Sequence, residues 1–141
     1  MEIEGFGTLI NPDEIDWIET PGGNSLKVLR VSEETGSYTA LFKAEAGTTN
    51  APHVHLGPAD FYVISGVMEY RGGTSKAGDW IYEPNGAEHE ATHHPEETIY
   101  LANVHGPIAF YGEPTEEGGE RPIIAISDWR GMKALQDMQG N

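Results

Sequence analysis

Residues 47–66 read GTTNAPHVHLGPADFYVISG, and this stretch decides the fold. It places His53 and His55 two positions apart, directly before a run of apolar and aromatic residues that is typical of a β-strand. Side chains at positions i and i+2 of a strand project to the same face, so the two imidazoles point together. Two imidazoles can bind a divalent ion at about 2.1 Å but cannot complete its coordination, so another strand must supply a further ligand.

The further ligand is expected in residues 78–94, which read GDWIYEPNGAEHEATHH. A strand opens at Gly78, a turn follows at residues 84–86, and His89 comes at the start of the next strand. If the two segments are neighbours in a barrel, His89 completes a triangle of three nitrogens with His53 and His55. The sequence therefore predicts a three-histidine metal site.

The rest of the chain is predicted to be rich in short strands, separated by turns that draw on 18 glycines and 9 prolines. The strand-like segments are residues 26–31, 37–44, 60–71, 79–84, 98–104 and 107–112, with a hairpin near Gly72-Gly73. Short helices are expected at residues 11–18, with Asn11 as cap, and at residues 127–138, with Ser127 or Asp128 as cap. This pattern predicts one all-β domain, a sandwich or a barrel, over residues 1–141.

Composition excludes several functional classes. The chain has no cysteine, so disulfides and thiolate metal sites are absent. Its formal net charge of −15 repels phosphate groups, so neither nucleic acid nor a membrane surface is an expected partner. The first residues do not resemble a signal peptide, and no apolar run approaches the roughly 18 residues that span a bilayer. We therefore expect a cytoplasmic protein.

Two motifs resemble those of the cupins. The first cupin motif is Gly, five residues, His-x-His, three or four residues, Glu, six residues and Gly. The second is Gly, five residues, Pro-x-Gly, two residues, His, three residues and Asn. In this chain the motifs span residues 47–66 and 78–93, and they match at Gly47, His53, His55, Gly66, Gly78, Pro84, Gly86 and His89. The resemblance implies a jelly-roll barrel that forms a homodimer, and the residue patterns above add a short helix at the N-terminal and at the C-terminal end.

Two positions depart from the cupin pattern, because Ala59 stands at the glutamate position and His93 at the asparagine position. With three neutral imidazoles and no carboxylate, a divalent metal site keeps a net charge near +2, against about +1 for a site with two histidines and one carboxylate. Such a site is expected to favour an anionic chelating ligand, for example the enolate of a β-dicarbonyl or an α-hydroxyketone.

Within the cupins, residues 53–92 are similar to the acetylacetone dioxygenase and 2,4'-dihydroxyacetophenone dioxygenase group, which is related to the cupin half of ChrR-type proteins. The resemblance implies a three-histidine dioxygenase with one Fe(II) per chain, or Zn(II) as isolated, that uses O₂ to cleave a C–C bond of a small dicarbonyl or hydroxyketone. Two alternatives stay open: a metal-dependent sensor or ligand-binding cupin without catalysis, and a zinc-dependent hydrolase or isomerase.

Several other residues are candidates for the surroundings of the metal. Arg71 and Glu83 could orient an imidazole or stabilise charge on the substrate, although both could equally be charges at the rim. Substrate-pocket candidates are Ala59, Phe61, Tyr70 and His105. Finally, His93 and His94 are expected in an exposed loop.

Overall fold

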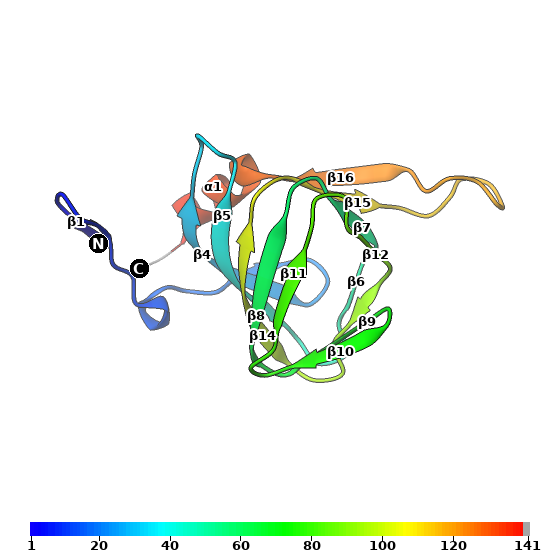
Figure 1. Ribbon diagram of the computed structural model, residues 1–141, viewed down its shortest axis with the longest axis horizontal. Helices are drawn as coiled ribbons and strands as arrows, with labels where there is room; N and C mark the ends of the chain where they lie inside the picture. The colour runs from blue at the N-terminus through cyan, green and yellow to red at the C-terminus, as the bar shows by residue number, and fades with distance from the viewer. Residues whose placement is uncertain (140–141) are drawn as a thin grey trace.

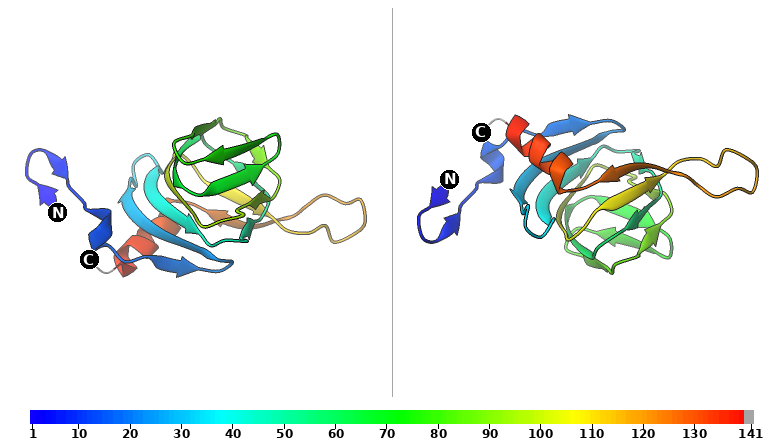
Figure 2. Two further views of the ribbon diagram at one scale, coloured as in Figure 1. Left: turned by 90° about the horizontal axis from the view of Figure 1, so that it is seen from below. Right: turned by 90° about the horizontal axis from the view of Figure 1, so that it is seen from above.

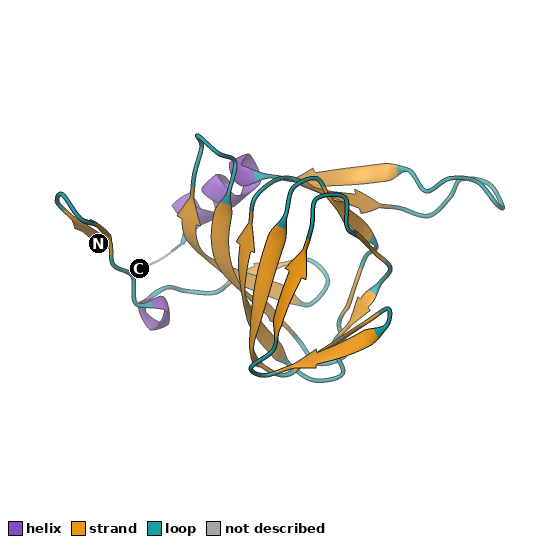
Figure 3. Ribbon diagram, in the orientation of Figure 1, coloured by secondary structure: helices purple, strands orange, loops and turns teal. Residues whose placement is uncertain are grey.

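Two walls of antiparallel strands face each other and enclose the interior (Figures 1 and 3). The structure, a computed structural model, describes residues 1–139. One wall is a six-stranded sheet in the order β11-β8-β14-β5-β4-β3. Its strands are β3 (Ile18–Thr20), β4 (Asn24–Val31), β5 (Tyr38–Ala44), β8 (Ala59–Ser65), β11 (Trp80–Glu83) and β14 (Thr98–Val104).

The opposite wall consists of two four-stranded sheets, in the orders β12-β7-β15-β16 and β10-β9-β13-β6. The first contains β7 (His53–His55), β12 (Glu88–His89), β15 (Ile108–Tyr111) and β16 (Ile123–Ser127). The second contains β6 (Thr49–Asn50), β9 (Val67–Tyr70), β10 (Gly73–Lys76) and β13 (Thr92–His93). This arrangement confirms the predicted all-β jelly-roll barrel. Figure 2 shows the N-terminal hairpin, β1 (Glu2–Ile3) with β2 (Gly7–Thr8), standing away from the barrel on one side and the β15–β16 loop on the other.

Glycine sets the corner between the walls. The expected strand 60–71 is divided at Gly66, where the chain leaves β8 in one wall and enters β9 in the other. Gly66 has φ +86°, and a Cβ atom there would lie 2.2 Å from the carbonyl oxygen of Glu97. The hairpin predicted near Gly72-Gly73 is confirmed, since Tyr70 in β9 pairs with Gly73 in β10.

Helices lie at both ends of the described chain, and the first is shorter than predicted. It is a 3-10 turn, η1 (Pro12–Glu14), in which the Asn11 side chain accepts a hydrogen bond from the Asp13 backbone N–H. The prediction of helix up to residue 18 is wrong because Ile18–Thr20 pairs with β4. At the other end, α1 (Trp129–Met138) begins after Asp128, whose side chain accepts from the Arg130 N–H. No helix among residues 1–139 is long and apolar enough to cross a membrane.

The core lies inside the six-stranded wall and under α1. Alternate residues of β4, β5, β8 and β14 point inward, as period-2 strands require. The buried cluster consists of Leu26, Val28, Tyr38, Ala59, Ala102, Val104 and Met132. Since Met132 belongs to α1, the helix closes this side of the barrel.

Candidate metal centre

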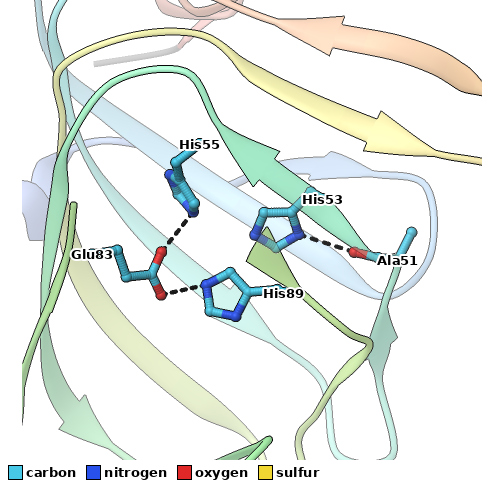
Figure 4. Close-up of polar contacts among 5 residues, drawn as sticks. All are labelled: Ala51, His53, His55, Glu83 and His89. Atoms are coloured by element: carbon cyan, nitrogen blue, oxygen red, sulfur yellow. Dashed lines mark hydrogen bonds and ion pairs between the residues drawn. The ribbon is translucent and has the colours of Figure 1, made fainter. Parts of the chain in front are cut away.

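Three histidines meet at one end of the barrel interior. His53 and His55 come from β7, and β12 pairs beside them so that His89 lies directly opposite His53. One nitrogen from each of the three imidazoles lies within 4.8 Å of the others. The close-up in Figure 4 shows the rings turned toward a shared space. The pairing of β7 with β12 confirms the prediction that the segments carrying the two motifs are neighbours in the barrel.

The His53 ring is held in the orientation and protonation state of a ligand. Its Nδ1 lies 2.9 Å from the Ala51 carbonyl oxygen, to which it can donate a hydrogen bond. This leaves Nε2 with a free lone pair, the arrangement common among metal-binding histidines. Burial lowers the pKa of His53 to about 4, although the Ala51 hydrogen bond acts in the opposite direction. The ring is therefore neutral at pH 7 and able to bind a cation.

Glu83 supplies the carboxylate that Ala59 lacks. In the antiparallel pair of β11 and β8, Glu83 is directly opposite Ala59, and directly opposite residues project to the same face. Its Oε2 lies 2.6 Å from His55 Nε2, and its Oε1 lies 2.5 Å from His89 Nε2 (Figure 4). Of the two locations that the sequence left open for Glu83, beside an imidazole or at the rim, the structure shows the first.

The charge of Glu83 changes the electrostatic expectation for the site. Burial raises the pKa of Glu83, but the close contacts of its oxygens with the His55 and His89 imidazoles more than offset this and lower the pKa to about 2. The carboxylate is therefore ionised at neutral pH. The expectation of a site near +2 considered only the three imidazoles, whereas a full negative charge lies directly beside them.

The buried polar atoms fit a metal ion. His55 Nε2 and Glu83 Oε2 are buried, and no residue in the described chain gives either of them a well-oriented hydrogen bond, despite their close approach. Buried polar atoms are rarely left without a partner, and here both face the space between the rings. Three imidazoles and a carboxylate form a donor set that suits divalent first-row transition metals.

An apolar cavity of about 600 Å³ begins at His53 and extends under the six-stranded wall to α1. Phe61 lines it, as predicted, and its ring lies edge-on to His55 with centroids 6.1 Å apart. The apolar side chains in its wall are Leu26, Phe42, Phe61, Val104, Ile108, Phe110, Met132 and Leu135. One of the three histidines, His53, therefore faces a space that can hold the apolar part of a small molecule.

Three other pocket candidates lie elsewhere. Ala59 is in the core cluster, Tyr70 lies against Gly73 of the β9–β10 hairpin, and His105 is exposed in the turn between β14 and β15. None of the three is among the residues that line this cavity in the described chain. Only Phe61 of the four candidates thus lies at the cavity wall.

Arg71 lies at the rim of a second, charged cleft, which His89 also lines. Its side chain is 67% exposed and lies 3.5 Å from the carboxylate of Glu90, which is equally exposed. This cleft has a volume of about 490 Å³ and also includes Glu88 and Arg121. Arg71 therefore shares this cleft with His89 and pairs with Glu90, whereas Glu83 contacts two of the imidazoles directly.

His94 is buried, although an exposed loop was expected. It is fully enclosed, with Nδ1 3.3 Å from the Val67 carbonyl oxygen and Nε2 3.4 Å from Asn50 Nδ2. Its ring is parallel to that of Tyr100, with centroids 6.3 Å apart. The prediction was wrong because β13 carries His94 into the barrel end, where its ring packs instead of meeting solvent. The expectation of an exposed loop was wrong for His93 too, since it lies in β13, is half-buried and is hydrogen-bonded to Thr49.

Comparison with known proteins agrees with this geometry. Residues 7–109 match the model of the ChrR cupin-like domain. The chain is 37% identical over 114 residues to an acetylacetone-cleaving enzyme from Acinetobacter johnsonii, covering 77% of this chain and 71% of the relative.

Solved structures give the same result. A candidate acetylacetone dioxygenase from Methylibium petroleiphilum PM1 is 31% identical with a TM-score of 0.81, covering 96% of this chain and 98% of that one. The acetylacetone dioxygenase from Acinetobacter johnsonii is 28% identical with a TM-score of 0.77, covering 98% and 95%. The chain therefore belongs to the ChrR cupin-like family.

Proposed function

We propose that the protein is an Fe(II)-dependent dioxygenase that cleaves a C–C bond of a small dicarbonyl or hydroxyketone with O₂. The observation that carries the proposal is the three-histidine cluster, one member of which, His53, also lines an apolar cavity. The similarity of the chain to an acetylacetone-cleaving enzyme supports the same reaction class. His53, His55 and His89 would hold one metal ion per chain.

The ion, when bound, would provide a positive charge that the oxygens of the substrate can chelate. It would also provide the redox activity that O₂ chemistry requires. Three protein nitrogens leave further coordination positions open, as both tasks need. A dioxygenase reaction places both atoms of O₂ in the products, so one O₂ is consumed per substrate and no external reductant is needed.

The residues of the chain have separate tasks in this proposal. The Ala51 carbonyl holds His53 in its ligand orientation, and Glu83 lies against two imidazoles with a negative charge that offsets the charge of a cation. The apolar wall excludes water from the substrate, which strengthens electrostatic interactions at the ion. These features support a small, weakly polar substrate whose chelating oxygens face the histidines.

Oxygen uptake by metal-loaded protein tests the proposal. The protein is loaded anaerobically with Fe(II), and O₂ consumption is followed with acetylacetone, benzoylacetone and 2,4'-dihydroxyacetophenone. We expect one O₂ per substrate for at least one compound, and none with Zn(II)-loaded protein or with His89→Ala. No uptake with any of the three would contradict the dioxygenase proposal for these substrates. Turnover with Zn(II) alone would instead indicate a hydrolase or isomerase.

A further inference from the structure

One polar group in the cavity wall has no task in the metal centre. The polar side chains that line the cavity are Thr20, Asn24, Thr49, Asn50, His53, Tyr100 and Ser127. All but one of them make a hydrogen bond with another residue of the protein. The exception is Tyr100, whose hydroxyl has no hydrogen-bond partner among the described residues.

The other polar side chains are accounted for one by one. Asn24 Nδ2 donates to Asn50 Oδ1 at 2.8 Å, and Asn50 Nδ2 lies 3.4 Å from His94. The Thr20 hydroxyl donates to the Asn24 carbonyl oxygen at 3.0 Å. The remaining partners are His93 for Thr49, the Ala51 carbonyl for His53 and the Tyr38 side chain for Ser127.

The ring of Tyr100 is fixed in place, so its hydroxyl has a defined position. Tyr100 comes from β14, where even-numbered residues point into the barrel, and its ring stacks on Phe42 with centroids 5.4 Å apart. Phe61 lies edge-on to Tyr100 at 6.0 Å and edge-on to His55 at 6.1 Å. Phe61 therefore contacts both Tyr100 and a histidine of the metal centre, and all three rings belong to the same interior.

Tyr100 remains a hydrogen-bond donor under all ordinary conditions. Burial raises the pKa of its hydroxyl, and the negative charge of Glu83 raises it further. A tyrosine hydroxyl in an apolar cavity usually finds an acceptor, and for the half-buried Tyr100 this acceptor can be water or a ligand. The cavity itself offers space for a ligand that carries this acceptor.

We propose that the Tyr100 hydroxyl donates a hydrogen bond to an oxygen atom of the bound substrate and so contributes to substrate selection. This inference rests on the proposed function, because it takes the ligand to be a dicarbonyl or hydroxyketone. An oxygen of such a ligand satisfies the hydroxyl, while the carbon skeleton contacts Phe42 and Phe61. A hydrocarbon of the same shape would leave the hydroxyl without a partner and would bind less tightly.

The experiment compares binding without turnover. Wild-type protein, Tyr100→Phe and Tyr62→Phe are each loaded with Zn(II), and the affinity for benzoylacetone is measured by calorimetry. Tyr100→Phe removes only the hydroxyl and keeps the ring stack. Tyr62→Phe is the matched control, because Tyr62 is 47% exposed and does not line the cavity. Metal content and circular dichroism establish that all three proteins are folded and loaded.

We expect Tyr100→Phe to bind benzoylacetone about tenfold more weakly than wild type, the usual effect of losing one hydrogen bond. The absorption maximum of the bound diketone should also shift, because the hydrogen bond alters its electronic environment. Tyr62→Phe should behave as wild type. Equal affinity and an unshifted spectrum in Tyr100→Phe would overturn the proposal, as would wild-type protein that binds no dicarbonyl.

Failure of the proposed function would be recognised separately. The binding comparison uses neither Fe(II) nor O₂, so a protein that binds dicarbonyls through Tyr100 but consumes no O₂ keeps this inference and loses the dioxygenase proposal. If wild type and Tyr100→Phe instead consumed O₂ at the same rate and with equal KM, the dioxygenase proposal would stand and the inference about Tyr100 would fail.

Discussion

At the scale of single residues, the carboxylate of Glu83 is expected to set the affinity for metal. Its two oxygens lie against Nε2 of His55 and of His89, so its charge stabilises a cation held by these rings. Glu83→Gln keeps the size of the side chain and removes the charge. We predict a 10- to 100-fold loss of Zn(II) affinity, the usual cost of removing a group that supports metal ligands. Competition with a chromophoric chelator measures it.

The matched control for this prediction is Glu90→Gln. Glu90 follows His89 directly and has the same charge, but its side chain is 67% exposed and pairs only with Arg71. Its replacement should change Zn(II) affinity by no more than about twofold, because exposed charges interact weakly through solvent. If the two variants lost affinity equally, the effect would come from overall charge and not from the position of Glu83.

The three histidines could be predicted from the sequence, but the residues around them could be predicted only in part. His53 and His55 share a face because strand side chains alternate, a local rule. That Glu83 faces Ala59 depends on the register of β11 against β8, which is a property of the folded sheet. Arg71 stands five positions after Gly66, yet a hairpin carries it outward. No local pattern distinguishes Tyr100 from an ordinary core tyrosine.

At the scale of elements, the two strand-joining glycines of the cupin motifs have different tasks. Gly66 and Gly78 both have positive φ, +86° and +92°. A Cβ atom on Gly66 would meet the backbone of Glu97 and Thr98, at 2.2 and 2.6 Å, whereas nothing lies within 4 Å of one on Gly78. Gly66 is thus required both for its backbone conformation and for close packing at the corner between β8 and β9.

Alanine substitutions should separate these two effects. We predict that Gly78→Ala costs about 1–2 kcal/mol, the penalty for placing an L-residue in the left-handed region. Gly66→Ala should cost more than about 3 kcal/mol, since backbone atoms cannot move aside as a flexible side chain can. Urea unfolding of both variants measures the difference. Equal losses would mean that the corner relaxes without cost.

The strands that the sequence predicts best are those with one buried face. Residues 98–104 form β14 with the predicted bounds, because they are rich in the β-branched and aromatic residues that favour strands. β16 was not predicted, although its sequence, IIAIS, is rich in β-branched residues, because it is too short and too uniformly apolar to show an alternating pattern. Its pairing with β15 is a tertiary contact that no local pattern contains.

At the scale of the whole molecule, the cavity is formed jointly by the barrel and the C-terminal helix. Its wall includes His53 at one end and Met132 and Leu135 of α1 at the other, far apart in sequence. A five-carbon diketone would fill only part of its volume of about 600 Å³, since each non-hydrogen atom occupies roughly the volume of one water molecule, about 30 Å³. Homodimer formation and the cytoplasmic location stay predictions.

The size of this cavity predicts that the protein prefers the larger of two diketone substrates, and that residues of α1 determine this preference. Benzoylacetone, with its phenyl group, should fill more of the apolar space than acetylacetone and should therefore show the lower KM in wild-type protein. Leu135→Trp places a larger side chain at the α1 end of the cavity, distant from the histidines. We expect it to raise KM for benzoylacetone about tenfold and to change KM for acetylacetone by less than about twofold.

Ala134→Trp is the control for the size effect, because Ala134 is the preceding residue of α1 and is exposed to solvent. It adds the same indole ring to the same helix without entering the cavity, so both KM values should stay at their wild-type level. A Leu135→Trp protein that still bound benzoylacetone as wild type does would place the phenyl group elsewhere, and the charged cleft beside His89 would then be the alternative location. If instead both substrates lost affinity equally in Leu135→Trp, the helix would act on the metal centre through the barrel rather than on the substrate through contact.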